Sequence, residues 1–347
     1  MANFNLNKLI FNSLIPQIRS AAGITIISVV ILAIVATIDK GSYIIINTIV
    51  TGGMWALMAM GLALLFGVMN VPNFAHGEFF MIGTLVSYYV ITPIKDYISN
   101  NPNPFYEGVG PLIAIFSAAV IGCLVGIMCE LILFRPLRMR SREQWVMNSF
   151  LLTLGLSIIL VNSHQLLVGT DFKGIVSYWD YSPISIFDTY ISFDRCFTFI
   201  FALLVMACFW LFMKYSKSGK AVRAVSQDET GSLMVGINLN RIQTITMALS
   251  CGLASLAGAC LLFMFPSYPT VGVLPLYNSF FVIIVAGMGN VAGAAIGGFI
   301  IALFQVLTSV YVGEGWGLII PLAFIIIILI FKPSGIFSTG VRGILEK

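Results

Sequence analysis

Polar residues gather in one short stretch of a chain that is otherwise strongly apolar. Residues 67–78 read Gly-Val-Met-Asn-Val-Pro-Asn-Phe-Ala-His-Gly-Glu and hold one of the two histidines of the protein. Apolar segments long enough to cross a membrane, or nearly so, lie on both sides, at about 44–66 and 79–94. Polar and helix-breaking groups are costly in lipid unless they face protein, a cavity or an interface. This stretch is therefore the first candidate for a functional site.

The side chains of this stretch would suit recognition of a small zwitterion. Asn70 and Asn73 are able to cap the start of the following helix, and Pro72 is tolerated near its first turn. The amides of that helix end would present partial positive charge to a carboxylate, while Glu78 would attract an ammonium group. A plainer alternative is that both asparagines only cap, and that His76 and Glu78 pair with each other or with another helix.

Groups typical of catalysis or metal binding are not recognisable. Residues 218–221 (Ser-Gly-Lys-Ala) lack the upstream glycine and the hydroxyl of a P-loop, so no nucleotide cradle is expected on this chain. The histidines, His76 and His164, form no HExxH motif, and the six cysteines show no metal or redox spacing and are interpreted as small buried hydrophobes. We therefore expect neither an enzyme nor a bound cofactor or metal. A membrane-embedded enzyme is the weakest alternative.

The composition fixes the class of protein that must hold these residues in place. Of 347 residues, 59% are hydrophobic and 9% are charged, with a mean hydropathy of +0.99. A soluble domain is usually about 25% charged. The sequence therefore predicts an all-α polytopic membrane protein with a single transmembrane domain over residues 1–347, in contact with the lipid bilayer and not with nucleic acid.

About ten transmembrane helices are predicted from the apolar runs. The runs lie at about 21–38, 44–67, 78–94, 111–134, 145–168, 196–213, 243–265, 278–290, 291–310 and 318–331. The first run continues to Asp39-Lys40 without a clear cleavage site, so we interpret it as a membrane helix and not as a signal peptide. The eighth run is short, and residues 278–310 are alternatively one broken or re-entrant element.

The placement of lysine and arginine predicts that both termini are cytoplasmic. With residues 1–20, 135–142, 214–242 and 332–347 inside, 14 of the 18 basic residues fall on the cytoplasmic side. Glu130, at an inner helix end near Arg135, is expected to belong to a surface ion pair.

Two loops are long enough to have a role of their own. The inner loop holds a helical pattern over 221–235 that stops at Gly236. It is either a solvated amphipathic connector or a helix that docks on another subunit. The acidic outer loop, 169–194, would form a short surface helix or receive a partner.

An internal repeat relates two parts of the chain. Residues 67–79 align with 287–299 at a constant offset of 220, and six of the thirteen positions are identical. Transporters often carry such copies, with broken or short helices where the halves meet. The second copy also has a small residue at every fourth position, which predicts a flat helix-packing face formed by Gly289, Gly293 and Gly297. Gly122 and Gly126 offer the same spacing in the fourth run.

Four motifs resemble, in order, those of branched-chain amino acid ABC transporter permeases. They are residues 61–70 with 73–78 (GLALLFGVMN, NFAHGE), 219–228 with 234–238 (GKAVRAVSQD, MVGIN), 287–294 (GMGNVAGA) and 331–337 (FKPSGIF). The resemblance covers about residues 44–340 and is greatest for the first of the two permease subunits, which carries the NxAHGE run. Serine is commoner in the family at the position of Asn290. Pro72 replaces a more usual apolar residue, and this departure leaves the choice of solute open.

The resemblance implies an importer of branched-chain or other hydrophobic amino acids in the bacterial inner membrane. A second homologous permease would complete the pathway, two cytoplasmic ATPases would use ATP, and an extracytoplasmic binding protein would deliver the solute. The pathway residues would be Asn70, Asn73, His76, Glu78 and Asn290. The residues that couple to the ATPases would be Arg223, Asp228, Glu229 and Gly236.

Two other functions remain open on the sequence. A urea or short-amide permease of the same ABC class is the nearest alternative, because those sister families share the AHGE motif. A stand-alone secondary transporter or channel would explain the repeat and the polar stretch. It would not explain the basic, helix-like inner loop that ends at Gly236.

Overall fold

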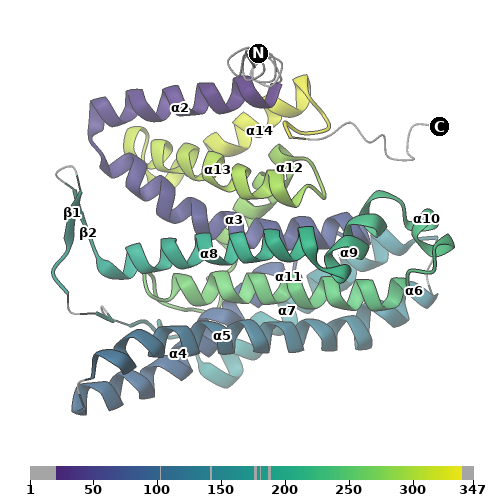
Figure 1. The fold of residues 1–347 in the computed structure, drawn as a ribbon, viewed down its shortest axis with the longest axis horizontal. Coiled ribbons are helices and arrows are strands. Elements are labelled where there is room, and N and C mark those ends of the chain that lie inside the picture. Colours follow the sequence, from purple (N-terminus) through teal and green to yellow (C-terminus); the bar gives the residue numbers. More distant parts are fainter. Residues whose placement is uncertain are drawn as a thin grey trace, which may run out of the picture.

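Helices make up almost all of the structure. The computed structural model describes residues 21–101, 103–140, 143–175, 178–179, 181–186 and 189–337, so both predicted cytoplasmic termini lie largely outside the described residues. The long helices of the described chain are α2 (Ala21–Lys40), α3 (Tyr43–Met69), α4 (His76–Asn100), α5 (Pro104–Cys129), α7 (Trp145–Val168), α8 (Phe193–Tyr215), α11 (Leu239–Leu261), α13 (Val291–Tyr311) and α14 (Ile319–Phe331) (Figure 1).

The predicted fold class is confirmed. Within the described ranges, nine helical spans are long and apolar enough to cross a membrane, the last of them (Glu314–Phe331) being α14 together with the 3₁₀ turn before it. Helix α12 (Val273–Ala286) is a shorter apolar helix. These ten elements correspond to the ten predicted runs, because only continuous helices satisfy their own backbone hydrogen bonds in lipid.

The core is built around two enclosed helices, α3 and α11. In the most apolar 18-residue stretch of each, 83% is buried, whereas the corresponding share is 6% for α2 and 11% for α14. Helix α3 packs on α13, α11 and α12, and α11 packs on α5 and α4. A helix that is apolar on all sides is typical of such a central position. The outer helices leave their apolar faces for lipid or for partners.

Glycines bring α11 close to its neighbours. A Cβ at Gly126 of α5 would lie 2.8 Å from the Cβ of Cys251, and one at Gly122 would overlap Ser255. The predicted packing role of these two glycines is therefore confirmed. All six cysteines are free; Cys208 is exposed, so the prediction of uniformly buried cysteines is wrong for that residue.

The predicted flat face of α13 is only partly correct. Gly289 has a φ of 83° and precedes the helix, where it contacts Gly67 at the end of α3. Gly293 lies against Asn290, and Gly297 faces Val282 of α12. The three glycines therefore do not share one helix face, because the helix starts only at Val291.

Helix α12 explains the short eighth run. It has 14 residues, about 21 Å of helix, which is less than the roughly 30 Å of a hydrocarbon core. The chain unwinds after α11, and Gly272, which precedes α12, contacts Gly77 in the first turn of α4. Residues 278–310 thus form two helices separated at 287–290, and the two junctions of the proposed repeat meet at Gly67 and Gly289.

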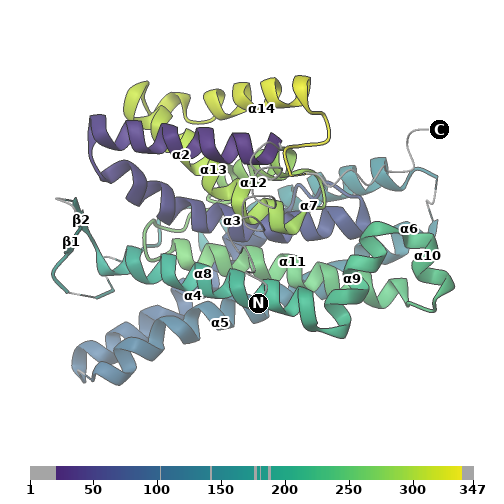
Figure 2. The same cartoon turned by 45° about the horizontal axis from the view of Figure 1, so that its top comes forward.

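The two ends of the helix bundle differ. The short helices α6 (Arg135–Arg140), α9 (Lys217–Gln227) and α10 (Glu229–Met234) lie together at one end, the right in Figures 1 and 2. At the other end, β1 (Ile184–Ile186) and β2 (Thr189–Ile191) form an antiparallel hairpin, so the described part of the outer loop contains a hairpin where a surface helix was considered. This separation agrees with the sorting by charge, since the basic loops lie at one end.

Candidate functional site

The polar stretch forms the junction between α3 and α4. Asn70 ends α3 in the left-handed conformation, with a φ of 53°, and its N–H donates to the Phe66 carbonyl at 2.9 Å. It is exposed and does not cap α4, so that expectation is wrong for Asn70. The side chain of Asn73 does lie at the start of α4, where Oδ1 accepts from the N–H of Ala75 at 3.0 Å.

Three buried side chains of this junction have unsatisfied polar atoms. Asn73 and His76 are fully buried and Glu78 is 4% exposed. The Asn73 Nδ2 donor, the His76 Nδ1 nitrogen and the Glu78 Oε2 oxygen have no hydrogen-bond partner among the described residues. Buried polar atoms of this kind are uncommon in native proteins and call for an explanation, such as water, an ion or a ligand.

His76 and Glu78 pair with other helices and not with each other. His76 Nε2 lies 3.1 Å from the Met58 carbonyl oxygen of α3, so Nε2 carries the proton in this contact. The Ser157 hydroxyl of α7 donates to Glu78 Oε1. Of the two plainer alternatives, pairing with a neighbouring helix is the one observed.

Helix α7 covers the junction along one of its faces. Its first residue, Trp145, donates from Nε1 to the Met69 carbonyl at 3.1 Å, and the Thr153 hydroxyl lies 3.4 Å from the Pro72 carbonyl. With the Ser157 bond to Glu78, these contacts follow the junction from its start to the first turn of α4. Only 17% of the most apolar 18-residue stretch of α7 is buried, so the other faces of this helix are not covered by the described chain.

Three phenylalanines meet beside the junction. The ring centroid of Phe74 lies 5.1 Å from that of Phe150 on α7 and 5.0 Å from that of Phe280 on α12. All three rings are partly exposed. No pattern in the sequence predicts this cluster, because the chain holds 27 phenylalanines and the three come from separate elements.

Asn290 lies at the second junction and has a structural role there. Its Oδ1 caps α13 by accepting from the Gly293 N–H at 2.9 Å, and its Nδ2 donates to the Phe337 carbonyl at 2.8 Å. Both ends of the amide are thus occupied. The structure does not bring this side chain together with the Asn73–Glu78 group by any contact between them.

A second polar group was missed by the sequence analysis. Trp55 of α3 donates to Gln305 Oε1 of α13 at 2.9 Å, and Asn278 of α12 approaches the same oxygen at 3.4 Å. Asn278 Oδ1 and Ser279 Oγ are buried without a partner among the described residues. These residues lie in apolar runs, where only the tertiary contacts distinguish them.

Glu130 is not at the surface, which corrects the expected surface ion pair with Arg135. It is fully buried, in a π-helical turn (Glu130–Phe134) between α5 and α6. Its Oε1 pairs with Arg138 Nη2 at 2.7 Å, and the guanidinium carbon lies 5.5 Å from the ring centroid of Trp145.

The predicted inner helix consists of two helices. Ser216 caps α9, and Asp228 breaks the helix and caps α10 by accepting from the Gly231 N–H at 2.9 Å. Gly236 has a φ of 83° and ends the segment as predicted. Arg223, Asp228, Glu229 and Gly236 are all exposed at this end of the molecule.

The apolar residues at the C-terminal end of α10, here called its tip, are exposed as well. Leu233, Met234 and Val235 are 53%, 83% and 76% exposed. Helix α9 buries Val222 and Val225 against the body of the protein and contacts α8, α3 and α11. The segment thus combines an anchored helix, α9, with an exposed apolar end on α10.

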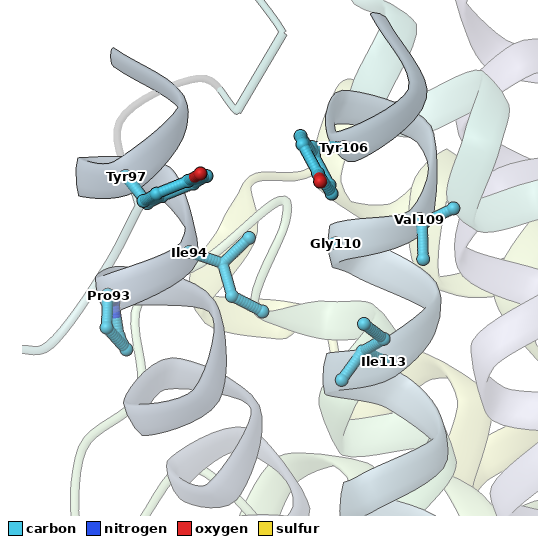
Figure 3. Close-up of a pocket in the computed structure, with 7 residues that line it drawn as sticks. All are labelled: Pro93, Ile94, Tyr97, Tyr106, Val109, Gly110 and Ile113. Carbon is cyan, nitrogen blue, oxygen red and sulfur yellow. The ribbon is translucent and has the colours of Figure 1, made fainter. Parts of the chain in front are cut away.

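An apolar cleft of about 380 Å³ opens between the distal parts of α4 and α5 (Figure 3). Tyr97 and Tyr106 lie on opposite sides of it, and the other lining residues are Pro93, Ile94, Val109, Gly110 and Ile113. None of the predicted pathway residues lines this cleft, and its lining carries no charge. It is therefore not the candidate site.

Comparison with known proteins gives one consistent family. The family described as branched-chain amino acid transport system / permease component matches residues 44–329. The chain is 27% identical to the high-affinity branched-chain amino acid transport permease LivH of Salmonella typhimurium, over 84% of this chain and 94% of the relative. It is 27% identical to BraD of Pseudomonas aeruginosa (85% and 94%). It is 21% identical to a probable permease LivM of Methanocaldococcus jannaschii (82% and 90%). No solved structure matches.

Proposed function

This chain belongs to the permease-component family of branched-chain amino acid transport systems, and from that membership we propose that it is the membrane-spanning subunit of an ATP-binding cassette importer. The proposed solute is a branched-chain or other hydrophobic amino acid. An extracytoplasmic binding protein delivers the solute, and separate cytoplasmic ATPases drive its passage.

The observation that carries this proposal is the α3–α4 junction. A zwitterion crossing an apolar scaffold needs a donor for its carboxylate and an anion for its ammonium group. Asn73 Nδ2 and the start of α4 supply the first, and Glu78 Oε2 supplies the second. Both atoms belong to residues five positions apart at the start of α4, are buried, and have no partner in the described chain.

The α9–α10 segment supports the proposed link to the ATPases. Its exposed tip (Leu233, Met234 and Val235) would enter an apolar groove of an ATPase, with Arg223 and Glu229 at the rim. Because α9 contacts α3 and α11, a displacement of the α9–α10 segment would be transmitted to α3, whose C-terminal end forms the junction. The transmembrane helices would then rotate as rigid bodies, which is a common type of conformational change in proteins.

A second permease is the proposed partner of the open face formed by α7 and α12. Helix α12 exposes an apolar stripe that includes Val273, Leu274 and Tyr277. Two probable permeases of Methanocaldococcus jannaschii, LivH and LivM, are both similar to this chain, which supports a pair of homologous permeases.

The test is reconstitution. The chain is co-expressed with a candidate second permease and ATPases, purified, placed in vesicles and supplied with leucine-loaded binding protein and ATP. We expect a stable complex and ATP-dependent leucine uptake. The chain alone in vesicles is the control, and uphill uptake by it would show a stand-alone transporter. Uptake of urea or a short amide in place of leucine would show the sister class.

A further inference from the structure

We propose that Phe74, Phe150 and Phe280 form the surface that contacts the aliphatic side chain of the amino acid as it passes the α3–α4 junction. This inference rests on the proposed function and deepens it, because it assigns the selectivity of the pathway to three named rings. They come from the junction, from α7 and from α12.

The rings are placed for a ligand contact. Each is partly exposed in the isolated chain, and the Phe74 and Phe150 rings meet edge to face at an interplanar angle of 88°. Phe74 directly follows Asn73, whose Nδ2 is an unpaired buried donor. The rings and an unsatisfied polar group thus belong to the same α3–α4 junction, and small-molecule sites generally combine an apolar lining with a few polar groups.

The spacing matches the size of an amino acid. Phe150 and Ser157 are seven residues apart on one face of α7, about 10 Å along the axis, and Ser157 holds the Glu78 carboxylate. A leucine molecule extends about 5 Å from its ammonium nitrogen to a terminal methyl group, judged from covalent geometry. With about 3 Å for the hydrogen bond at one end and about 4 Å for the ring contact at the other, the solute reaches both.

The same rings would disfavour polar solutes. A polar side chain placed among the three rings finds no hydrogen-bond partner on them and loses its water. A small side chain such as that of alanine leaves the rings uncovered. The cluster would therefore prefer branched aliphatic side chains over small or polar ones, in addition to the choice made by the binding protein.

Photolabelling of the intact importer tests the contact. A leucine analogue with a diazirine in its side chain is loaded on the binding protein and irradiated during ATP-driven turnover. We expect adducts on peptides that contain Phe74, Phe150 or Phe280. Adducts confined to other segments, while leucine uptake proceeds, would overturn this inference and leave the proposed function standing. Absence of leucine uptake by the wild type would overturn the proposed function and this inference with it.

Selectivity provides an independent measurement. Phe280→Ala and Phe74→Ala are expected to lower the ratio of leucine to alanine uptake by about tenfold, the lower range for a lost apolar pocket contact. The matched control is Phe324→Ala, which removes a ring from the stacked Phe304–Phe324 pair between α13 and α14 and should leave the ratio unchanged. An equal loss of both solutes in the cluster variants would mean that the rings only pack, and would overturn the inference.

Discussion

Glu78 is held inside the helix bundle by a single hydrogen bond, from Ser157, and its second oxygen is free of protein partners in the described chain. A carboxylate in this position is costly to bury, so its presence requires a compensating interaction. The ammonium group of a passing amino acid would supply one.

Glu78→Gln is expected to lower ATP-dependent leucine uptake at least about tenfold without disturbing assembly. The amide keeps an oxygen for Ser157 but loses the charge, and a hydrogen bond to a charged group contributes roughly 1.5–3 kcal/mol. Uptake in vesicles and co-purification with the ATPases are measured together. The companion variant Ser157→Ala keeps the charge and removes only the hydrogen bond, so a smaller loss of uptake is expected from it. Normal uptake by the Gln variant in an intact complex would remove Glu78 from the site.

Glu130 and Arg138 form the second buried charged group. Their one bond of 2.7 Å joins the π turn to α6, and Arg138 in turn lies over Trp145 at the start of α7. This arrangement fixes the beginning of the helix that covers the junction.

Glu130→Gln is expected to destabilise the purified chain by about 3 kcal/mol, because it leaves a largely buried guanidinium without its counter-charge. A lower midpoint of thermal unfolding, followed by tryptophan fluorescence, would show the loss. The double variant Glu130→Leu with Arg138→Met should recover most of it, since a buried pair replaced by apolar groups is often neutral or stabilising. Equal midpoints for wild type and the Gln variant would contradict this account.

At the scale of the elements, the proposed contact with the ATPases depends on where the short helix α10 ends. Helix α10 ends because Gly236 adopts a φ of 83°, at which its N–H donates to the Leu233 carbonyl at 3.0 Å. Proline fixes φ near −65° and has no N–H, so it is incompatible with this stop. The exposed tip would then be displaced.

Gly236→Pro and Arg223→Glu are therefore expected to weaken ATPase association about tenfold while the chain still inserts in the membrane. The matched control is Gly313→Pro at the opposite end, where φ is 119° and the N–H donates to the Thr308 carbonyl at 2.9 Å. It breaks an equivalent helix stop far from the proposed interface. Normal association in both coupling variants, measured by co-purification, would exclude this segment as the docking element.

At the scale of the whole molecule, the bundle depends on close approach of α4, α5 and α13 to the enclosed helices. A Cβ at Gly83 of α4 would overlap the backbone of Ser255 on α11. Backbone cannot yield as a flexible side chain can, so the helices would have to separate. Gly155 of the open helix α7 has no heavy atom near the position of a Cβ.

Gly83→Ala is expected to lower the yield of monodisperse protein severalfold in detergent, because overpacking a core costs roughly 1–3 kcal/mol. Gly155→Ala should be neutral or stabilising, since alanine favours an exposed helix position by up to about 1 kcal/mol. Size-exclusion profiles of the two variants, expressed in parallel, measure the difference. Equal profiles would mean that the α4–α11 contact is looser than the structure has it.

The sequence by itself determined the class of the protein, its spans and the location of the polar junction. Lipid imposes continuous apolar helices, so composition and run length sufficed for these. The types of residue at the junction were also readable, because Asn73, His76 and Glu78 stand out in an apolar chain.

Only the tertiary structure decided which atoms these residues meet. Met58 and Ser157 are far from the junction in sequence, and the three phenylalanines resemble many others in the chain. Asn70 and Asn290 are equivalent in the proposed repeat, yet one ends α3 and the other begins α13. Membrane helices are alike in composition, so which faces come together is set by close packing of small residues and by the few buried polar bonds. The spacing of Gly122 and Gly126 indicates a packing face but not the helix that it meets, and the buried polar bonds leave no periodic pattern.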